Sequence, residues 1–197
     1  MNFSVRGISK SYQGRRVLND VSFSFSSSDR LIIMGPSGCG KTTLCRILAG
    51  LERPDSGTLQ GFDLLRLSMV FQEDRLCSHL SAVENAALPL QKKDTAPAFE
   101  ALTKLGVTKE DLSKPVVQLS GGQKRRAALA RAMLAPGELV ILDEPFKGLD
   151  AENRLRAASF ILDMQQGRSL ICVTHEAVEA DLLHGKTLLL PMSGGIS

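Results

Sequence analysis

The sequence contains no tryptophan, a single tyrosine and no apolar run close to the roughly 20 residues that span a bilayer. Its first six residues also lack the apolar core of a secretory signal peptide. Lys and Arg exceed Asp and Glu by only 24 to 21, a formal charge of +3, so no nucleic-acid partner is expected. We therefore expect a cytoplasmic protein that reaches a membrane only through a partner, on the inner face of the cell membrane.

Cysteine is scarce, and the cysteines that are present form no recognisable pair. The four residues show no C-x-x-C pair and no spacing typical of metal ligands. Free thiols in a reducing compartment are the simplest interpretation. They are Cys39, Cys45, Cys77 and Cys172.

A glycine-rich stretch fits the pattern G-x-x-x-x-G-K-[ST] at every fixed position. The apolar run 31–34 predicts a buried strand just before it, and 41–49 predicts a helix just after it, ending at Gly50. Glycines let several backbone N–H groups converge on one anion at the positive end of that helix. The stretch therefore predicts a nucleoside triphosphate site formed by Gly35, Pro36, Ser37, Gly38, Cys39, Gly40, Lys41, Thr42 and Thr43.

Two carboxylates follow the apolar run 139–142, which predicts a buried parallel strand. Such a strand delivers Asp143 and Glu144 to the carboxyl edge of the sheet, where ligands of open α/β folds bind. Lys41 is expected to reach the β- and γ-phosphates, and Thr42 and Asp143 to ligate Mg²⁺. Glu144 would then be the general base that activates the attacking water. The alternative is a pair of solvated acids at a strand end.

A second anion-binding device lies far along the chain. Ser120 is a natural N-cap for a helix over 124–135, and Gly121 and Gly122 expose backbone N–H groups at its positive end. A capped Gly-Gly helix start is mostly structural when it occurs alone. In a chain that already has a phosphate loop, we favour the functional interpretation.

The order of the expected elements indicates an α/β fold with a helical insertion. Strands are expected at 3–8, 21–26, 58–60, 68–71, 139–142, 169–174 and 186–190. Helices are expected at 41–49, 81–89, 98–105, 109–112, 124–135 and 151–166. Residues 10–18 are expected to form a turn. Because few β-branched residues occur between 73 and 118, that segment is expected to be a helical subdomain inserted between the core segments 1–72 and 119–197.

Two residues leave alternatives open. Tyr12, in the expected turn, could stack on a base, although a lone tyrosine is more often packed on the surface. His175 follows the strand 169–174 and is expected at the same sheet edge as Asp143. It could serve a structural role or contact a γ-phosphate.

With these motifs in order, the chain resembles the ATP-binding subunits of ABC transporters over almost its whole length. The phosphate loop alone would indicate only a broad class, whereas the complete series is highly specific. The resemblance implies that Tyr12 stacks on adenine and that Gln72 is the Q-loop glutamine, which takes part in catalysis and Mg²⁺ binding. It also makes 119–123 the signature motif, Asp150 the D-loop aspartate and His175 the switch histidine.

The resemblance also implies a fold, cofactors and partners. The fold would be a P-loop NTPase core with a parallel sheet, an N-terminal antiparallel β subdomain and a helical insertion. ATP and Mg²⁺ would bind between two copies or paralogues that meet head to tail. The γ-phosphate held by Lys41 of one chain would then contact the signature residues of the other, which are Ser120, Gly121, Gly122 and Gln123. The helical insertion and Gln72 would face an integral membrane permease.

The kind of transport remains open between import and export. Residues 71–76 look most like importer subunits of the nitrate, sulfonate and taurine type, which also work with an extracytoplasmic solute-binding protein. Two departures from that pattern occur, at 77–79 and at Lys147-Gly148 in the D-loop. Residues 85–90 are also similar to ATPases of lipoprotein-release and macrolide-export systems.

A soluble ATPase acting on nucleic acid or ribosomes is the alternative from another class. Only the basic triplet 124–126 supports it, and that triplet is more simply a solvated helix face.

Overall fold

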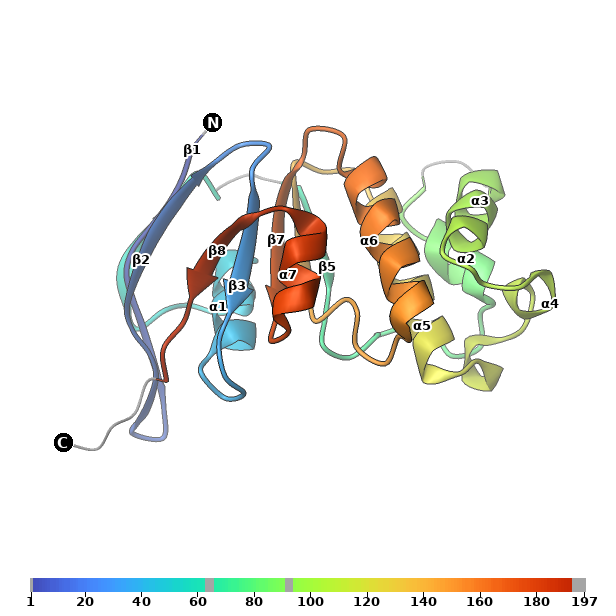
Figure 1. Ribbon diagram of the computed structural model, residues 1–197. Helices are drawn as coiled ribbons and strands as arrows, with labels where there is room; N and C mark the ends of the chain where they lie inside the picture. Colours follow the sequence, from blue (N-terminus) through green and yellow to red (C-terminus); the bar gives the residue numbers. More distant parts are fainter. Residues whose placement is uncertain (1, 63–65, 91–93, 193–197) are drawn as a thin grey trace.

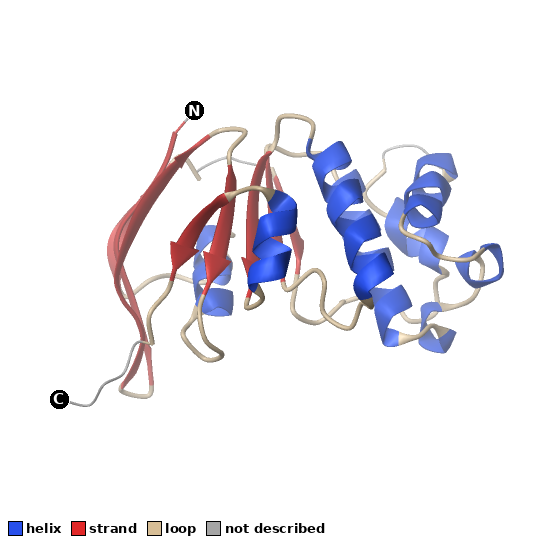
Figure 2. Cartoon of the chain, in the orientation of Figure 1, coloured by secondary structure: helices blue, strands red, loops and turns tan. Residues whose placement is uncertain are grey.

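Two β-sheets and a group of helices make up the fold (Figure 1; Figure 2). The computed structural model describes residues 2–62, 66–90 and 94–192. In this part of the chain no helix combines the length and the apolarity needed to cross a membrane.

The N-terminal sheet is antiparallel, with the strand order β2-β1-β4. Its strands are β1 (Asn2–Tyr12), β2 (Arg15–Ser26) and β4 (Ser56–Gln60). The expectation of a turn over residues 10–18 is wrong, because both strands continue to a two-residue turn at Gln13 and Gly14. Both turn residues have positive φ, 50° and 80°. Such a turn matches the twist of a hairpin, so the strands can stay paired up to it.

The second sheet has five parallel strands in the order β5-β6-β7-β3-β8. They are β3 (Arg30–Met34), β5 (Leu67–Val70), β6 (Leu139–Asp143), β7 (Ser169–Thr174) and β8 (Lys186–Leu189). Every residue of β6 and β7 is buried, as expected for a sheet covered on both faces. Because the strands are parallel, the residues that follow β3, β6 and β7 meet at one edge.

Helices α5 (Gly121–Leu134) and α6 (Ala151–Gln165) stand between the parallel sheet and a distal group of helices (Figure 1). The distal group, which comprises α2 (Ala82–Ala87), α3 (Ala96–Lys104) and α4 (Lys109–Leu112), lies within the segment 73–118. The other helices are α1 (Lys41–Leu48), α5 (Gly121–Leu134), α6 (Ala151–Gln165) and α7 (Ala177–Leu183), with a 3₁₀ turn at Val116–Gln118. The limits of the helical subdomain stay a prediction, since α5 also packs on α2 and α3.

Sequence reasoning missed α7, a helix of seven residues. Its N-cap is Glu176, whose side chain makes no capping hydrogen bond, so the usual start signal is missing. By contrast, the helix expected from residue 81 does have a start signal, since Ser81 and Glu84 form a capping box with both reciprocal bonds present.

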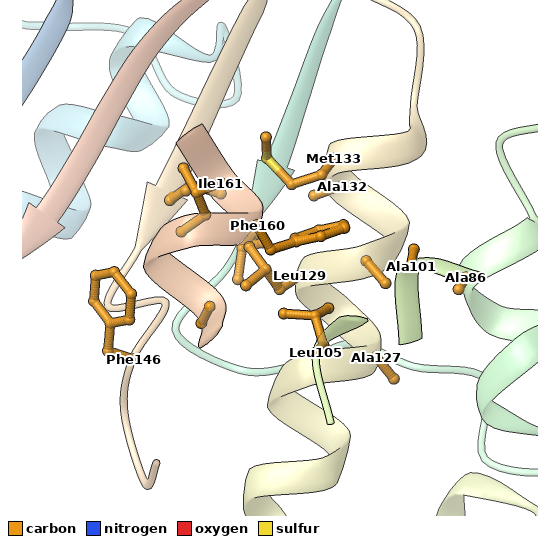
Figure 3. Close-up of a cluster of buried hydrophobic side chains, with 14 of the residues drawn as sticks. Ala86, Ala101, Leu105, Ala127, Leu129, Ala132, Met133, Phe146, Phe160 and Ile161 are labelled. Carbon is orange, nitrogen blue, oxygen red and sulfur yellow. The ribbon is translucent and has the colours of Figure 1, made fainter. Parts of the chain in front are cut away.

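The parallel sheet separates two hydrophobic cores. On one face, side chains of the antiparallel sheet and α1, such as Phe3 and Leu44, pack with alternate sheet residues such as Ile141. On the other face, the remaining sheet residues pack with the helices. Figure 3 shows Leu129 and Phe160 in this second core, near Ala101 of the distal group. Successive residues of one strand therefore enter different cores.

Candidate nucleotide-binding site

The phosphate loop connects β3 to α1, as the sequence predicts. Gly40 is the residue that caps α1, in the left-handed conformation with φ 98°. A Cβ atom at Gly40 would lie 2.8 Å from the Val17 carbonyl oxygen and 2.7 Å from a Leu18 methyl group of β2. Only glycine fits this position, both for its φ and for the close approach of β2. The loop is therefore pressed against the antiparallel sheet.

A hollow of about 350 Å³ opens above this loop. Its lining comprises Val17, Ser37, Gly38, Gly40, Lys41, Thr42, Thr43, Gln72 and Glu144. The Lys41 side chain is buried, and its Nζ donates to the carbonyl oxygens of Gly35 and Pro36, at 2.7 and 3.0 Å. The loop, one cation and the start of a helix thus converge on one space, which is the arrangement that binds phosphates. Sequence reasoning missed Val17, because a hydrophobic residue on a strand carries no ligand signal.

Asp143 is the last residue of β6, and the residue is 1% exposed. Neither of its oxygens has a hydrogen-bond partner among the described residues. Burial raises the pKa of Asp143, while the nearby Thr42 hydroxyl acts in the opposite direction. A buried carboxylate without partners is costly, and a bound cation would compensate that cost. The residues present therefore fit a hard divalent cation held by Asp143 and the Thr42 hydroxyl.

Glu144 turns away from the strand direction because its backbone is left-handed, with φ 53°. For a residue with a side chain this conformation costs about 1 kcal/mol. Its N–H donates to the Val173 carbonyl oxygen of the neighbouring strand, at 3.0 Å. Its carboxylate lines the hollow, with Oε1 3.6 Å from His175 Nδ1 and Oε2 4.0 Å from Lys147 Nζ. Glu144, His175 and Gln72 therefore gather near the phosphate loop.

The predicted signature residues form a capping box at the start of α5. Ser120 Oγ accepts from the Gln123 N–H, and Gln123 Oε1 accepts from the Ser120 N–H, at 3.3 and 2.8 Å. Gly121 is exposed, and a Cβ atom at Gly122 would lie 3.1 Å from the Gly148 carbonyl oxygen. A second hollow, of about 440 Å³, is lined by Gln72, Asp74, Gly121, Gly122, Arg125, Lys147 and Gly148. Gly121 and Gly122 thus line a different hollow from Lys41, and Gln72 lines both.

Two further predicted residues lie outside both hollows. Tyr12 is 43% exposed at the end of β1, and its hydroxyl donates to Glu52. Burial and this hydrogen bond raise the pKa of Tyr12, while the Thr43 hydroxyl acts in the opposite direction, which puts Tyr12 beside the phosphate loop. Asp150 is the N-cap of α6, and its side chain accepts from the Asn153 N–H at 2.8 Å. That bond lowers the pKa of Asp150.

The expectation that residues 124–126 form a solvated helix face is wrong for two of the three. Arg125 is 3% exposed and Arg126 is 8% exposed. Arg126 donates to the carbonyl oxygens of Leu105 and Gly106 and to the Asn153 side chain. Because these guanidinium groups are used inside the protein, they lend no support to nucleic-acid binding. A basic triplet alone gives no sign of such internal partners.

A parallel sheet with this phosphate loop, the Asp143–Glu144 strand end and a capped signature helix defines an ATP-binding, ATP-hydrolysing cassette. Residues 18–147 match the family model described as "ABC transporter". The chain belongs to this family, which confirms the resemblance drawn from its motifs. The expected α/β architecture is confirmed as well.

Curated relatives and solved structures agree with this assignment. The chain is 39% identical to the taurine import ATP-binding protein TauB of Pseudomonas aeruginosa, over 98% of this chain and 76% of that protein. It is 40% identical to the aliphatic sulfonates import ATP-binding protein SsuB of Pectobacterium atrosepticum, over 93% of this chain and 71% of the relative. A dimeric structure of the ATP-binding cassette MJ0796, bound to ADP and Pi, superposes with a TM-score of 0.85 at 25% identity, covering 98% and 97% of the two chains.

Proposed function

We propose that this chain is the ATP-hydrolysing subunit of an importer and drives solute uptake through a separate membrane permease. The observation that carries the proposal is the convergence of Lys41, Gln72 and Glu144 on one hollow, beside the buried carboxylate of Asp143. The similarity to proteins named as taurine, sulfonate and sulfate import subunits supports import over export.

Each residue of the hollow has a distinct role in the proposed reaction. The loop N–H groups and Lys41 bind the β- and γ-phosphates of ATP. Thr42 and Asp143, with Gln72, would hold Mg²⁺, which neutralises charge that develops on the phosphates. Glu144 accepts a proton from the attacking water, and His175 contacts the γ-phosphate. Tyr12 stacks on the adenine from the edge of the loop.

The proposal includes a second copy of the chain or a paralogue. Lys41 and Gly121 line different hollows, and in the proposed dimer a γ-phosphate on Lys41 would meet the signature residues of the other chain. Ser120, Gly121, Gly122 and Gln123 would supply those contacts, with Asp150 near the interface. The dimeric cassette superposed above supports this arrangement.

The membrane partner would contact the helical subdomain, residues 73–118, and the neighbourhood of Gln72. The subunit would then be peripheral on the inner face of the membrane. An extracytoplasmic solute-binding protein would deliver the cargo to the permease.

A pull-down of tagged Glu144→Gln protein from detergent-solubilised native membranes, with ATP and Mg²⁺, tests this proposal. The substitution removes the general base and so traps the ATP-bound form. The double variant Lys41→Ala/Glu144→Gln is the control, because it should lose the nucleotide. Recovery of a permease with a solute-binding protein would support import. A permease with a large extracytoplasmic domain would favour export, and ribosomal or nucleic-acid partners alone would overturn the transporter role.

A further inference from the structure

Arg125 lies in the first turns of α5, the helix whose start carries the signature residues. Its side chain is buried, and it points toward the sheet edge rather than along its own helix. Buried guanidinium groups persist when their donors are satisfied, and the donors of Arg125 reach two other segments. Both segments carry residues of the nucleotide site.

The first segment is the end of β6. Arg125 Nη2 donates to the carbonyl oxygens of Asp143 and Glu144, the second at 2.6 Å, and Nε also donates to the Glu144 carbonyl oxygen, at 3.1 Å. These two carbonyl groups belong to the peptide planes on either side of the Glu144 Cα atom. Holding both planes fixes the backbone dihedrals of Glu144, whose φ of 53° is unfavourable without such support.

The second segment flanks Gln72, the residue expected to take part in catalysis and Mg²⁺ binding. Arg125 Nη1 donates to the Phe71 carbonyl oxygen at 2.6 Å and to Asp74 Oδ1 at 3.0 Å. The Phe71 carbonyl belongs to the peptide bond that Phe71 makes with Gln72. One guanidinium group therefore connects the signature helix, the Gln72 segment and the Glu144 turn.

We propose that Arg125 is a positioning residue for hydrolysis: it holds Glu144 in its left-handed conformation and Gln72 beside it, so that both face the γ-phosphate. This inference rests on the proposed role of Glu144 as general base. A lysine cannot replace the arginine, because its donors diverge from one nitrogen and cannot reach carbonyl groups on both segments as a planar fork does. If Arg125 were only structural, its replacement should lower kcat no more than the replacement of another arginine that bonds backbone carbonyl groups.

The variant Arg125→Lys tests this, with Arg168→Lys as the matched control. Arg168 also donates to backbone carbonyl oxygens, those of Met133, Ala135 and Met164, at the opposite end of β7 from His175. We expect Arg125→Lys to lower kcat by about tenfold to hundredfold. The KM for ATP and the affinity of the monomeric protein for nucleotide should stay unchanged. Arg168→Lys should leave kcat within about twofold of the parent while lowering the melting temperature. Equal kcat losses in the two variants would overturn the proposal.

A double-mutant cycle with Glu144→Gln separates positioning from general damage. When the base is already absent, adding Arg125→Lys should lower the residual hydrolysis rate by a smaller factor than in the parent, since only the positioning of Gln72 is still lost. The same fold-loss in both backgrounds would contradict the proposal. If Glu144→Gln alone hydrolyses ATP like the parent, Glu144 is not the general base. The single variant therefore tests the role of Glu144 independently of the role of Arg125. If Arg125→Lys does not fold, Arg125→Gln replaces it in the test. The same loss of kcat is expected, because a glutamine amide has too few donors to bond the carbonyl groups of the Glu144 turn and of the Gln72 segment together.

Discussion

His175 Nδ1 lies 3.6 Å from Oε1 of Glu144. The two residues follow β7 and β6, which are neighbours in the parallel sheet, so their proximity is a direct result of strand order. Two side chains from distant parts of the chain thus lie close together, and one of them, Glu144, lines the phosphate hollow.

Replacing Glu144 with Gln should lower the rate of ATP hydrolysis by roughly a hundredfold or more, because the amide cannot accept the proton of the attacking water. His175→Ala should lower kcat as well, since it removes a neighbour of Glu144 and the proposed contact with the γ-phosphate. Nucleotide binding should survive in both variants. Steady-state hydrolysis and binding of a fluorescent ATP analogue are the measurements, and a Glu144→Gln protein with parental kcat would refute the assignment.

Asp143→Asn should raise the free energy of unfolding of the nucleotide-free protein by about 1 kcal/mol, because it removes a buried charge without hydrogen-bond partners. The same change should abolish the stabilisation that ATP gives in the presence of Mg²⁺. Denaturant midpoints and ATP-dependent melting shifts, with Mg²⁺ or with EDTA, report both effects. Glu152→Gln, on the exposed surface of α6, serves as control. A destabilised Asp143→Asn protein that keeps its Mg²⁺-dependent shift would contradict the metal role.

The phosphate loop could be predicted from the sequence because its function constrains consecutive residues. Gly40 must be glycine for local reasons, and Lys41 and Thr42 follow it directly. The Asp143–Glu144 pair was recognisable in the same way, at the end of an apolar run.

Arg125 and Arg126 could not be assigned from the sequence, since their partners come from remote segments. Phe71, Asp143 and Asn153 become neighbours of these arginines only after the sheet and α6 have assembled. The extent of the first hairpin was missed for a different reason. A Gln-Gly turn is a weaker signal than Asn-Gly or Asp-Gly, so the strands were expected to stop early.

Arg126→Met should destabilise the protein by about 2 kcal/mol, because the buried carbonyl group of Leu105 and the part-buried one of Gly106 lose this donor. Lys124→Gln, at the more exposed position of the triplet, should change stability by no more than about 0.5 kcal/mol. Urea unfolding of the two variants makes the comparison. Equal and small effects would mean that Arg126 is replaceable in the folded protein.

Stability should also depend on pH through Glu179, a buried carboxylate that accepts from the Thr174 hydroxyl. Burial raises the pKa of Glu179 above its ordinary value of 4.5, and the Thr174 bond only partly offsets this. Folding therefore favours the protonated form, so this contribution is complete at pH below 4.5 and is lost as pH rises through the folded pKa.

Comparison with Glu179→Gln, which cannot titrate, isolates that contribution. The free energy of unfolding of the parent, relative to the variant, should fall as the pH increases from about 4 to above the folded pKa. Chemical denaturation across that interval measures the difference. A difference that stays constant or grows with pH would show that Glu179 is no more acidic in the unfolded chain.

Because the parallel sheet separates two hydrophobic cores, the sequence on one side of it can change independently of the packing on the other side. Val140 and Leu142 point into the helical core, and Leu139 and Ile141 into the core beneath the phosphate loop. A substitution that changes the packing of α2 or α3 therefore affects the helical core, while the core beneath the phosphate loop keeps its packing. The helices α2 and α3, which are proposed to face a permease, can therefore change with the cargo while the packing beneath the phosphate loop stays as it is.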